Sequence, residues 1–206
     1  MAVDDLELVG PTVVLRRPAR ADAEALWEAI VESTAEVGRW MEWCRPDYTR
    51  AEAQAWVAGA RSAWARGEAF DFVVVDRQEG AVLGGCGVNQ VDALNRRANL
   101  GYWVRTSATG RGVATEAAAL AAHLGLRELG LGRLEIVVAT PNLASQRVAA
   151  KLGAVREGVM RNRFWLQGDA VDAVLYSLVP SDLETDAARS GRRGPGRRGS
   201  PRPRRG

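Results

Sequence analysis

The sequence is poor in the residue types that mark several classes of protein. Its 206 residues include only two cysteines, Cys44 and Cys86, and one histidine, His123. Small secreted scaffolds are short and rich in cysteine, so we expect two unpaired intracellular thiols here. No stretch approaches the roughly 18 consecutive apolar residues of a transmembrane helix. Residues 1–8 are acidic and lack the apolar run of a signal peptide. These absences predict a soluble cytoplasmic protein.

Charge is distributed unevenly along the chain. The net charge is +3, but eight arginines and no acidic residue lie between Arg189 and Gly206. Residues 1–188 carry 20 basic and 25 acidic side chains, a net charge of −5. The basic segment consists of Arg, Gly, Pro and Ser only, a composition that cannot bury enough apolar surface to fold. We therefore expect an N-terminal extension, one folded domain and a disordered basic tail, at residues 1–10, 11–180 and 181–206.

Hydrophobic periodicity predicts strands and helices in a mixed order. Apolar and β-branched runs predict strands at residues 12–16, 70–76, 81–91, 99–104, 134–139, 160–166 and 171–178. Helices are predicted from Asp22, after the capping box of Thr49 and Glu52, and at residues 114–129 and 144–152. The nearly all-apolar run at 134–139 is expected to be buried on both faces. This order predicts a mixed α/β (α+β) fold and excludes a doubly wound parallel sheet.

The loop before the helix at 114–129 has the composition of an anion site. Gly110 and Gly112 permit unusual backbone dihedrals and a close approach to a ligand. The first amides of a helix, together with its dipole, attract anions, and Arg111 adds a positive charge. The residues suit a pyrophosphate cradle, but on their own they also suit a turn that binds nothing. A Walker loop and the dinucleotide fingerprint are excluded, because the Lys-Ser/Thr pair of the first and the third Gly of the second are missing.

The same loop resembles motif A of the GNAT superfamily of acyl-CoA-dependent N-acyltransferases. That motif is Arg/Gln-x-x-Gly-x-Gly/Ala, and it aligns with Thr109–Ala114, where Thr departs from the pattern at the first place. Further motifs are similar to the branch of ribosomal-protein alanine/serine N-acetyltransferases. In chain order they are Gly101-Tyr102-Trp103, Gly110–Ala117, Asn142-x-x-Ser145, Lys151-Leu152-Gly153, Glu157-Gly158 and Arg161. With the similar Trp40–Trp43 segment, the resemblance covers about residues 10–180.

The resemblance implies a fold, a cosubstrate and a set of binding residues. The fold is a mostly antiparallel sheet flanked by helices, with a V-shaped splay between its fourth and fifth strands, here 99–104 and 134–139. Acetyl-CoA is expected in that splay and transfers its acetyl group directly to an amine, with no metal. The residues implied to bind it are Trp103, Val104, Arg105, Thr109, Gly110, Arg111, Gly112, Val113, Ala114, Thr115, Asn142 and Ser145.

The sequence identifies the catalytic groups less clearly than the binding residues. The resemblance places Ser145 near the sulfur, as a general acid for the leaving thiolate. The alternative is that Asn142 caps a helix and Ser145 is an ordinary residue of its first turn. Glu135, at the start of a strand beside the cleft, is a candidate base that acts through water. His123 is expected to be structural because it lies inside a predicted helix.

The acceptor is expected to be a primary amine. Trp40, Glu42, Trp43 and Asn89 are candidates for its site, although the two Trp residues also suit core packing. Neutralising an α-amine costs about 1 kcal/mol at pH 7, against roughly 4.6 kcal/mol for a Lys side chain. A site without a strong base therefore favours a protein or peptide N-terminus, with a small-molecule amine as the alternative.

The basic tail supports a second hypothesis, a CoA-binding module held on RNA or the ribosome. Such binding would be non-specific and salt-sensitive, because the tail has the charge for phosphate contacts but no aromatic residues for stacking on bases. A tail without a function is the alternative.

Overall fold

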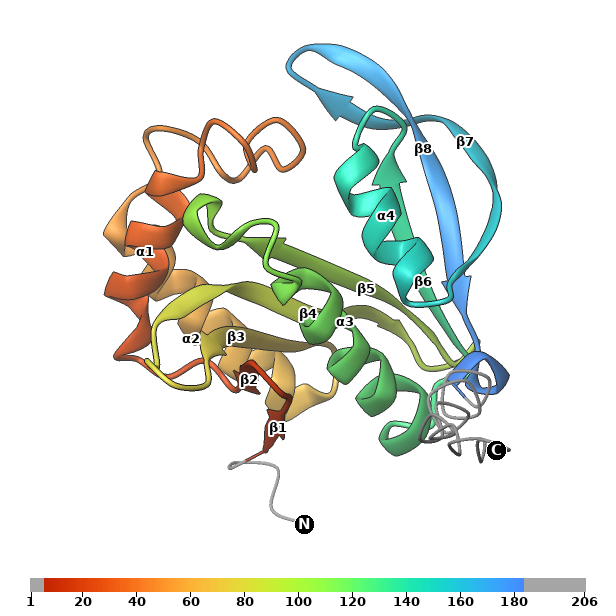
Figure 1. The fold of residues 1–206 in the computed structure, drawn as a ribbon, viewed down its shortest axis with the longest axis horizontal. Helices are drawn as coiled ribbons and strands as arrows, with labels where there is room; N and C mark the ends of the chain where they lie inside the picture. The colour runs from red at the N-terminus through yellow and green to blue at the C-terminus, as the bar shows by residue number, and fades with distance from the viewer. Residues whose placement is uncertain (1–5, 184–206) are drawn as a thin grey trace, which may run out of the picture.

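One sheet with helices on both faces forms the protein (Figure 1). The computed structural model describes residues 6–183, so the predicted basic tail lies outside the described residues from residue 184 on. The strands are β1 (Glu7–Val9), β2 (Val13–Arg16), β3 (Phe70–Asp76), β4 (Val82–Asp92), β5 (Arg97–Val104), β6 (Arg133–Ala139), β7 (Val155–Leu166) and β8 (Asp169–Leu178). The helices are α1 (Asp22–Glu32), α2 (Arg50–Arg66), α3 (Val113–His123) and α4 (Leu143–Lys151), with a 3₁₀ turn η2 (Thr106–Ala108) and a π-helical turn η3 (Leu124–Glu128).

The sheet is mostly antiparallel, as predicted. Its strand order is β1-β2-β3-β4-β5-β6-β8-β7, and the β5–β6 neighbours are its parallel pair. These two strands pair over three residues only, from Arg97 with Arg133 to Asn99 with Glu135. Beyond that point they diverge, and Figure 1 shows the gap widening between β5 and the β6–β8 side. The predicted V-shaped splay is therefore confirmed.

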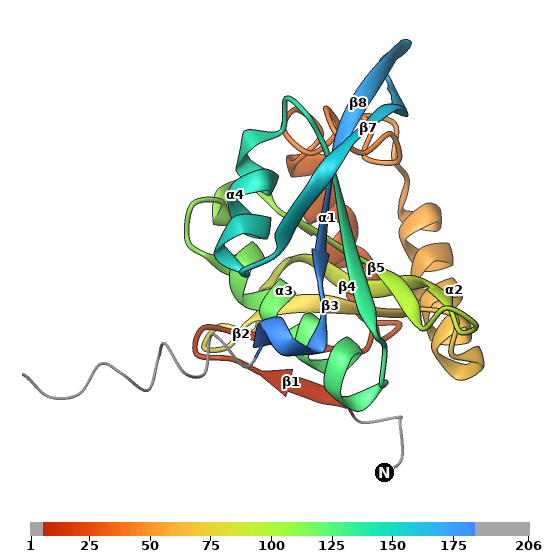
Figure 2. The ribbon, with the colours of Figure 1, turned by 90° about the vertical axis from the view of Figure 1, so that its right-hand side faces the viewer.

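Helices α1 and α2 lie on one side of the sheet, and α3 and α4 lie on the other (Figure 2). Helix α2 begins with the predicted capping box, in which Glu52 N–H donates to Thr49 and Thr49 N–H donates to the Glu52 carboxylate. It ends at Gly67, whose φ of 69° is the left-handed conformation that favours glycine. Val73 and Val75 of β3 pack on the α1–α2 side, and Phe72 and Val74 pack on the α3 side. This alternation gives the sheet a core on each face.

Two predicted elements differ in the structure. The helix predicted over 114–129 changes at His123 into the π-helical turn η3. An added Cβ at Gly125 would lie 3.2 Å from the Leu134 side chain, so this turn packs tightly against β6. The strand β6 is not buried on both faces: Ile136 and Val138 join the core, whereas Val137 on the opposite face is only half-buried.

The predicted N-terminal extension also contributes to the sheet. Residues 7–9 form the edge strand β1, which pairs with β2 from Glu7 with Arg16 to Val9 with Val14. No helix within residues 6–183 is long and apolar enough to cross a membrane.

Candidate active site

Two cavities meet where β5 leaves β6. The first, about 360 Å³, lies beside the loop that precedes α3, and we name it the loop-side cavity. The second, about 510 Å³, is lined by β3, β4 and β5 on one side and by β6 and β7 on the other, and we name it the sheet-side cavity. Six residues line both cavities, namely Trp40, Met41, Tyr102, Trp103, Asn142 and Ser145. A molecule in one cavity can therefore contact a molecule in the other at this junction.

The loop-side cavity contains the predicted anion site. Gly110 and Gly112 have φ values of 76° and 86°, in the left-handed region where an L side chain is strained. Gly112 caps α3 without a side chain, so the first-turn amides of Val113, Ala114 and Thr115 are open to a ligand. These amides and the helix dipole provide partial positive charge for a phosphate.

Most of the residues implied to bind the cosubstrate line this cavity. They are Trp103, Val104, Thr109, Gly110, Gly112, Val113, Ala114, Thr115, Asn142 and Ser145. Arg105 and Arg111 do not line it. The Arg105 guanidinium pairs with Glu32 and also donates to Val82 O, and Arg111 Nη2 donates to Asp76 Oδ2 at 3.4 Å. Carboxylates on α1 and β3 thus hold these two side chains, and the implied contacts of Arg111 and of the Arg105 backbone with the cosubstrate stay predictions.

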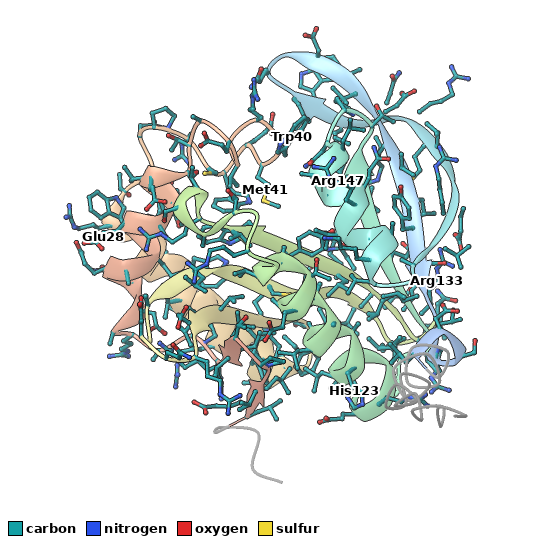
Figure 3. The ribbon with its side chains drawn as sticks, in the orientation of Figure 1. Glu28, Trp40, Met41, His123, Arg133 and Arg147 are labelled. Atoms are coloured by element: carbon teal, nitrogen blue, oxygen red, sulfur yellow. The ribbon has the colours of Figure 1, made fainter. Side chains whose placement is uncertain are left out.

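Helix α4 supplies the positive charge instead. Arg147 and Lys151 lie one helical turn apart and both line the loop-side cavity. Figure 3 shows Arg147 on the side of α4 that faces Trp40 and Met41 across the cleft. Neither residue was predicted to bind the cosubstrate, although their spacing of four on a predicted helix places them on one face.

A tyrosine–serine pair lies at the junction of the two cavities. The Tyr102 hydroxyl lies 3.0 Å from Ser145 Oγ and donates to Ser145 O at 3.2 Å. Burial raises the pKa of Tyr102 to about 12, so the phenol keeps its proton at neutral pH. Asn142 caps α4 by accepting the Ser145 N–H at 3.1 Å. Capping and a position in the cavity are therefore compatible for Asn142 and Ser145, and Tyr102 is a site residue that sequence reasoning missed.

The sheet-side cavity holds three of the four predicted acceptor residues. Trp40, Trp43 and Asn89 line it, and the Trp43 ring lies edge-on to Trp103 with centroids 5.6 Å apart. Glu42 is exposed and is not among the lining residues, so the structure does not bring it to the site.

Comparisons with known proteins identify the family of this chain. Residues 12–155 match the acetyltransferase (GNAT) domain family. The chain belongs to the GNAT family. YdaF of Bacillus subtilis strain 168, whose name assigns it to the N-acetyltransferases, is 26% identical over 177 residues, which cover 85% of this chain and 96% of YdaF. The ribosomal-protein-serine acetyltransferase of Escherichia coli strain K12 is 23% identical over 171 residues, which cover 83% of this chain and 94% of the relative.

Solved structures share the fold. RimJ of Mycobacterium smegmatis, in complex with CoA-disulfide, has a TM-score of 0.79 and 26% identity, and the match covers 89% of this chain and 94% of RimJ. The GNAT domain and the named relatives identify this protein as an N-acetyltransferase enzyme.

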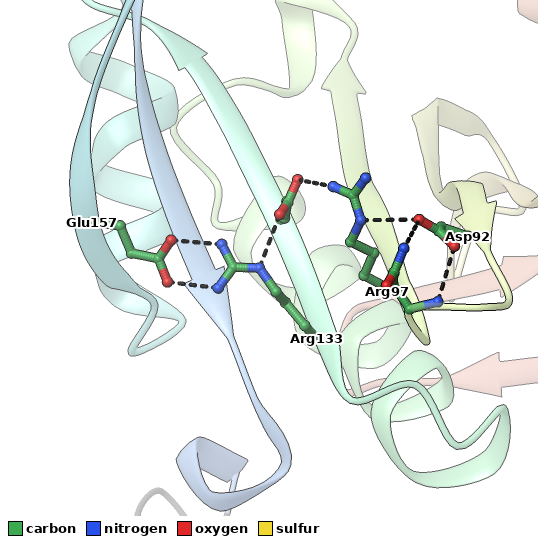
Figure 4. A network of polar contacts seen from close by, with 6 residues as sticks. Asp92, Arg97, Arg133 and Glu157 are labelled. Atoms are coloured by element: carbon green, nitrogen blue, oxygen red, sulfur yellow. Dashed lines mark hydrogen bonds and ion pairs between the residues drawn. The ribbon is translucent and has the colours of Figure 1, made fainter.

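Glu135, the predicted base of this GNAT enzyme, lies outside both cavities. It is at the last paired position of β5 and β6, where Arg133 Nε donates to Glu135 Oε1 at 2.9 Å and Arg97 Nη1 donates to Oε2 at 3.5 Å. Arg133 also makes two bonds of 2.6 Å to Glu157 (Figure 4). The structure therefore does not place Glu135 beside the reacting atoms. His123 is also remote, exposed at the end of α3 (Figure 3).

Proposed function

We propose that this GNAT enzyme transfers the acetyl group of acetyl-CoA to the N-terminal α-amine of a protein or peptide. The observation that carries the proposal is the junction of the two cavities at Tyr102 and Ser145. One cavity offers amides and two cations to an anionic donor, and the other offers aromatic and polar groups to an acceptor. The complex of the relative RimJ with CoA-disulfide supports a CoA site and therefore acetyl-CoA as the donor.

The fit of the loop-side cavity to CoA rests on the charges of this chain. The amides of the first α3 turn would hold the pyrophosphate, and Arg147 and Lys151 would neutralise phosphate charge from the facing helix. The free edge of β5 beyond Asn99 leaves backbone groups of Trp103 and Val104 beside the cavity for an amide-containing arm.

Ser145 is suited to assist the leaving sulfur. In the reaction the amine nitrogen forms a bond to the thioester carbon, the C–S bond breaks, and the sulfur leaves as a thiolate. The Tyr102 phenol lies 3.0 Å from Ser145 Oγ, and when the phenol donates its one proton to this oxygen, the Ser145 hydroxyl proton is free to donate to the sulfur as negative charge develops.

The acceptor class is supported by the named relatives. The E. coli relative is a ribosomal-protein-serine acetyltransferase, and it aligns with this chain over nearly its full length. The α-amine is also easier to neutralise than a Lys side chain, by about 3.6 kcal/mol at pH 7.

A thiol-release assay tests both parts of the proposal. Acetyl-CoA is offered with tetrapeptides that carry free N-termini, with the same peptides N-acetylated, and with small amines such as n-butylamine. We expect turnover with free peptide N-termini and none with their acetylated forms. Turnover with small amines alone would overturn the acceptor class, and no turnover with any amine would overturn the acetyl transfer.

A further inference from the structure

An aspartate and two glycines on neighbouring strands line part of the sheet-side cavity. Asp71 of β3 is paired with Gly87 of β4, which is paired with Gly101 of β5, so the three residues share one face of the sheet. Both glycines lack a side chain, and all three residues line the cavity. An added Cβ at Gly87 would lie 2.2 Å from Asp71 Oδ1, so the carboxylate extends over the space that glycine leaves open.

Two asparagines hold the Asp71 carboxylate in this position. Asn89 Nδ2 donates to Asp71 Oδ1 at 3.2 Å, and Asn99 Nδ2 donates to Asn89 Oδ1 at 2.9 Å. A β-bulge follows Asn89, where Gln90 adopts a φ of 53°. Bulges of this kind re-aim side chains beside active sites. Within residues 6–183, Asp71 Oδ2 accepts no hydrogen bond. The series of hydrogen bonds from Asn99 through Asn89 therefore ends at a carboxylate with one unbonded oxygen.

Asp71 is the only carboxylate among the described residues that line this cavity. The other ionisable groups there are Arg163 from β7, the Tyr102 phenol and the Cys86 thiol. Cys86 and Tyr102 are paired with each other and with Phe72, so they lie on the opposite face of the sheet from Asp71. Burial raises the pKa of Asp71, although the hydrogen bond from Asn89 opposes this. The carboxylate is therefore a stronger proton acceptor than an exposed Asp.

We propose that Asp71 binds the acceptor's ammonium group in the sheet-side cavity and removes one proton from it before attack. An N–H bond of the ammonium breaks, the proton moves to the carboxylate, and the freed lone pair forms the bond to the thioester carbon. The C–S bond then breaks, and the second proton that the nitrogen loses goes to the departing thiolate, which leaves as the thiol. The ligand class is a primary alkylammonium ion, and Asn89 and Asn99 are positioning residues. The proposal rests on the proposed acetyl transfer, and it assigns a base inside the sheet-side cavity, whereas Glu135 lines neither cavity.

The pH profile of kcat/KM distinguishes this role from a structural one. With Asp71 as base, the reactive pair is the ammonium form and the ionised carboxylate. The wild-type kcat/KM should then be level between the pKa of Asp71 and that of the amine near 8, and it should fall in acid. In Asp71→Asn only the neutral amine can react, so kcat/KM should rise about tenfold per pH unit up to pH 8. At pH 7 we expect it to be at least about 100-fold below wild type.

Asp169→Asn is the matched control, since it makes the same change at an exposed residue outside both cavities. CoA affinity and the melting temperature of Asp71→Asn should match those of the control. Calorimetric titration of n-butylammonium into the CoA-loaded proteins gives a readout that needs no turnover. We expect at least tenfold weaker binding to Asp71→Asn than to Asp169→Asn.

The outcomes separate the two proposals. A wild-type pH profile and wild-type amine affinity in Asp71→Asn would overturn the role of Asp71, whatever the acceptor. Weaker amine binding in Asp71→Asn, together with a wild-type enzyme that binds amines but acetylates none, would support Asp71 as an ammonium site and overturn the acetyl transfer. Loss of CoA binding or of folding in Asp71→Asn alone would identify Asp71 as structural.

Discussion

Gly112 offers a direct test of the anion site through a pair of nearly isosteric substitutions. Its φ is 86°, and an added Cβ would meet nothing within 4 Å. A substitution is therefore strained only by the backbone, by about 1 kcal/mol for a residue in the left-handed region. Asn and Asp tolerate this region better than other residues, so both Gly112→Asn and Gly112→Asp are expected to fold.

The charge of the aspartate should decide CoA affinity. Position 112 caps α3, where a pyrophosphate would contact the first-turn amides. Two like charges about 4 Å apart repel by about 4 kcal/mol at an effective dielectric constant of 20. That energy corresponds to roughly a thousandfold rise in Kd. Gly112→Asn has no such repulsion and should bind CoA within about tenfold of wild type. The carboxylate favours the helix dipole, so Gly112→Asp should melt no lower than Gly112→Asn.

Isothermal titration calorimetry with CoA, together with thermal melts, measures both effects. Gly80→Asp is the matched control, because Gly80 has a φ of 70°, an added Cβ there also meets nothing within 4 Å, and it lines neither cavity. This variant should bind CoA as wild type does. Equal CoA affinities for folded Gly112→Asp and Gly112→Asn would refute the placement of the pyrophosphate on α3.

Three further predictions concern the cavity junction, the charge on α4 and the capping box of α2. Ser145→Ala should lower kcat with near-normal CoA affinity, because it removes the hydroxyl at the cavity junction; wild-type turnover in steady-state assays would exclude the donor role. Arg147→Gln should raise the Kd for CoA about fivefold in titrations at low salt, and the loss should shrink at high salt, as for an exposed charge; a salt-independent effect would contradict this. Thr49→Ala should cost about 1 kcal/mol of the free energy of unfolding by breaking the capping box, and the melting temperature should fall by roughly 2–4 °C; an unchanged melt would contradict it.

The order of strands and helices could be predicted because it depends on local pattern. The predicted strand at 70–76 matches β3, and the capping box of Thr49 and Glu52 begins α2 as expected. The π-helical turn after His123 could not be predicted from periodicity, and the close packing of its Gly125 against Leu134 is a contact between separate elements that local pattern does not show.

The site was predicted where a motif is continuous in sequence and missed where strands bring residues together. Gly110 and Gly112 were identified because loop and helix start are adjacent in the chain. Asp71 gives no local signal, since it stands in an ordinary strand and becomes a site residue only through the register that pairs it with Gly87. The partner of Arg111 in the structure also depends on the fold: its sequence neighbours suggest a phosphate, and strand β3 brings Asp76 within 3.4 Å.

A network of ion pairs around Glu135 lies where β5 and β6 are paired, at the closed end of the cleft. Arg133 donates to both Glu135 and Glu157, so it joins β6 to β7, and Arg97 joins Glu135 to Asp92 of β4 (Figure 4). Single exposed ion pairs contribute little, but a linked set with a bidentate arginine fixes the geometry of the strands that it joins. Past this network β5 and β6 share no further paired residues, and the two cavities begin there. Glu135 thus lies at the closed end of the cleft, among the ion pairs that join β5, β6 and β7.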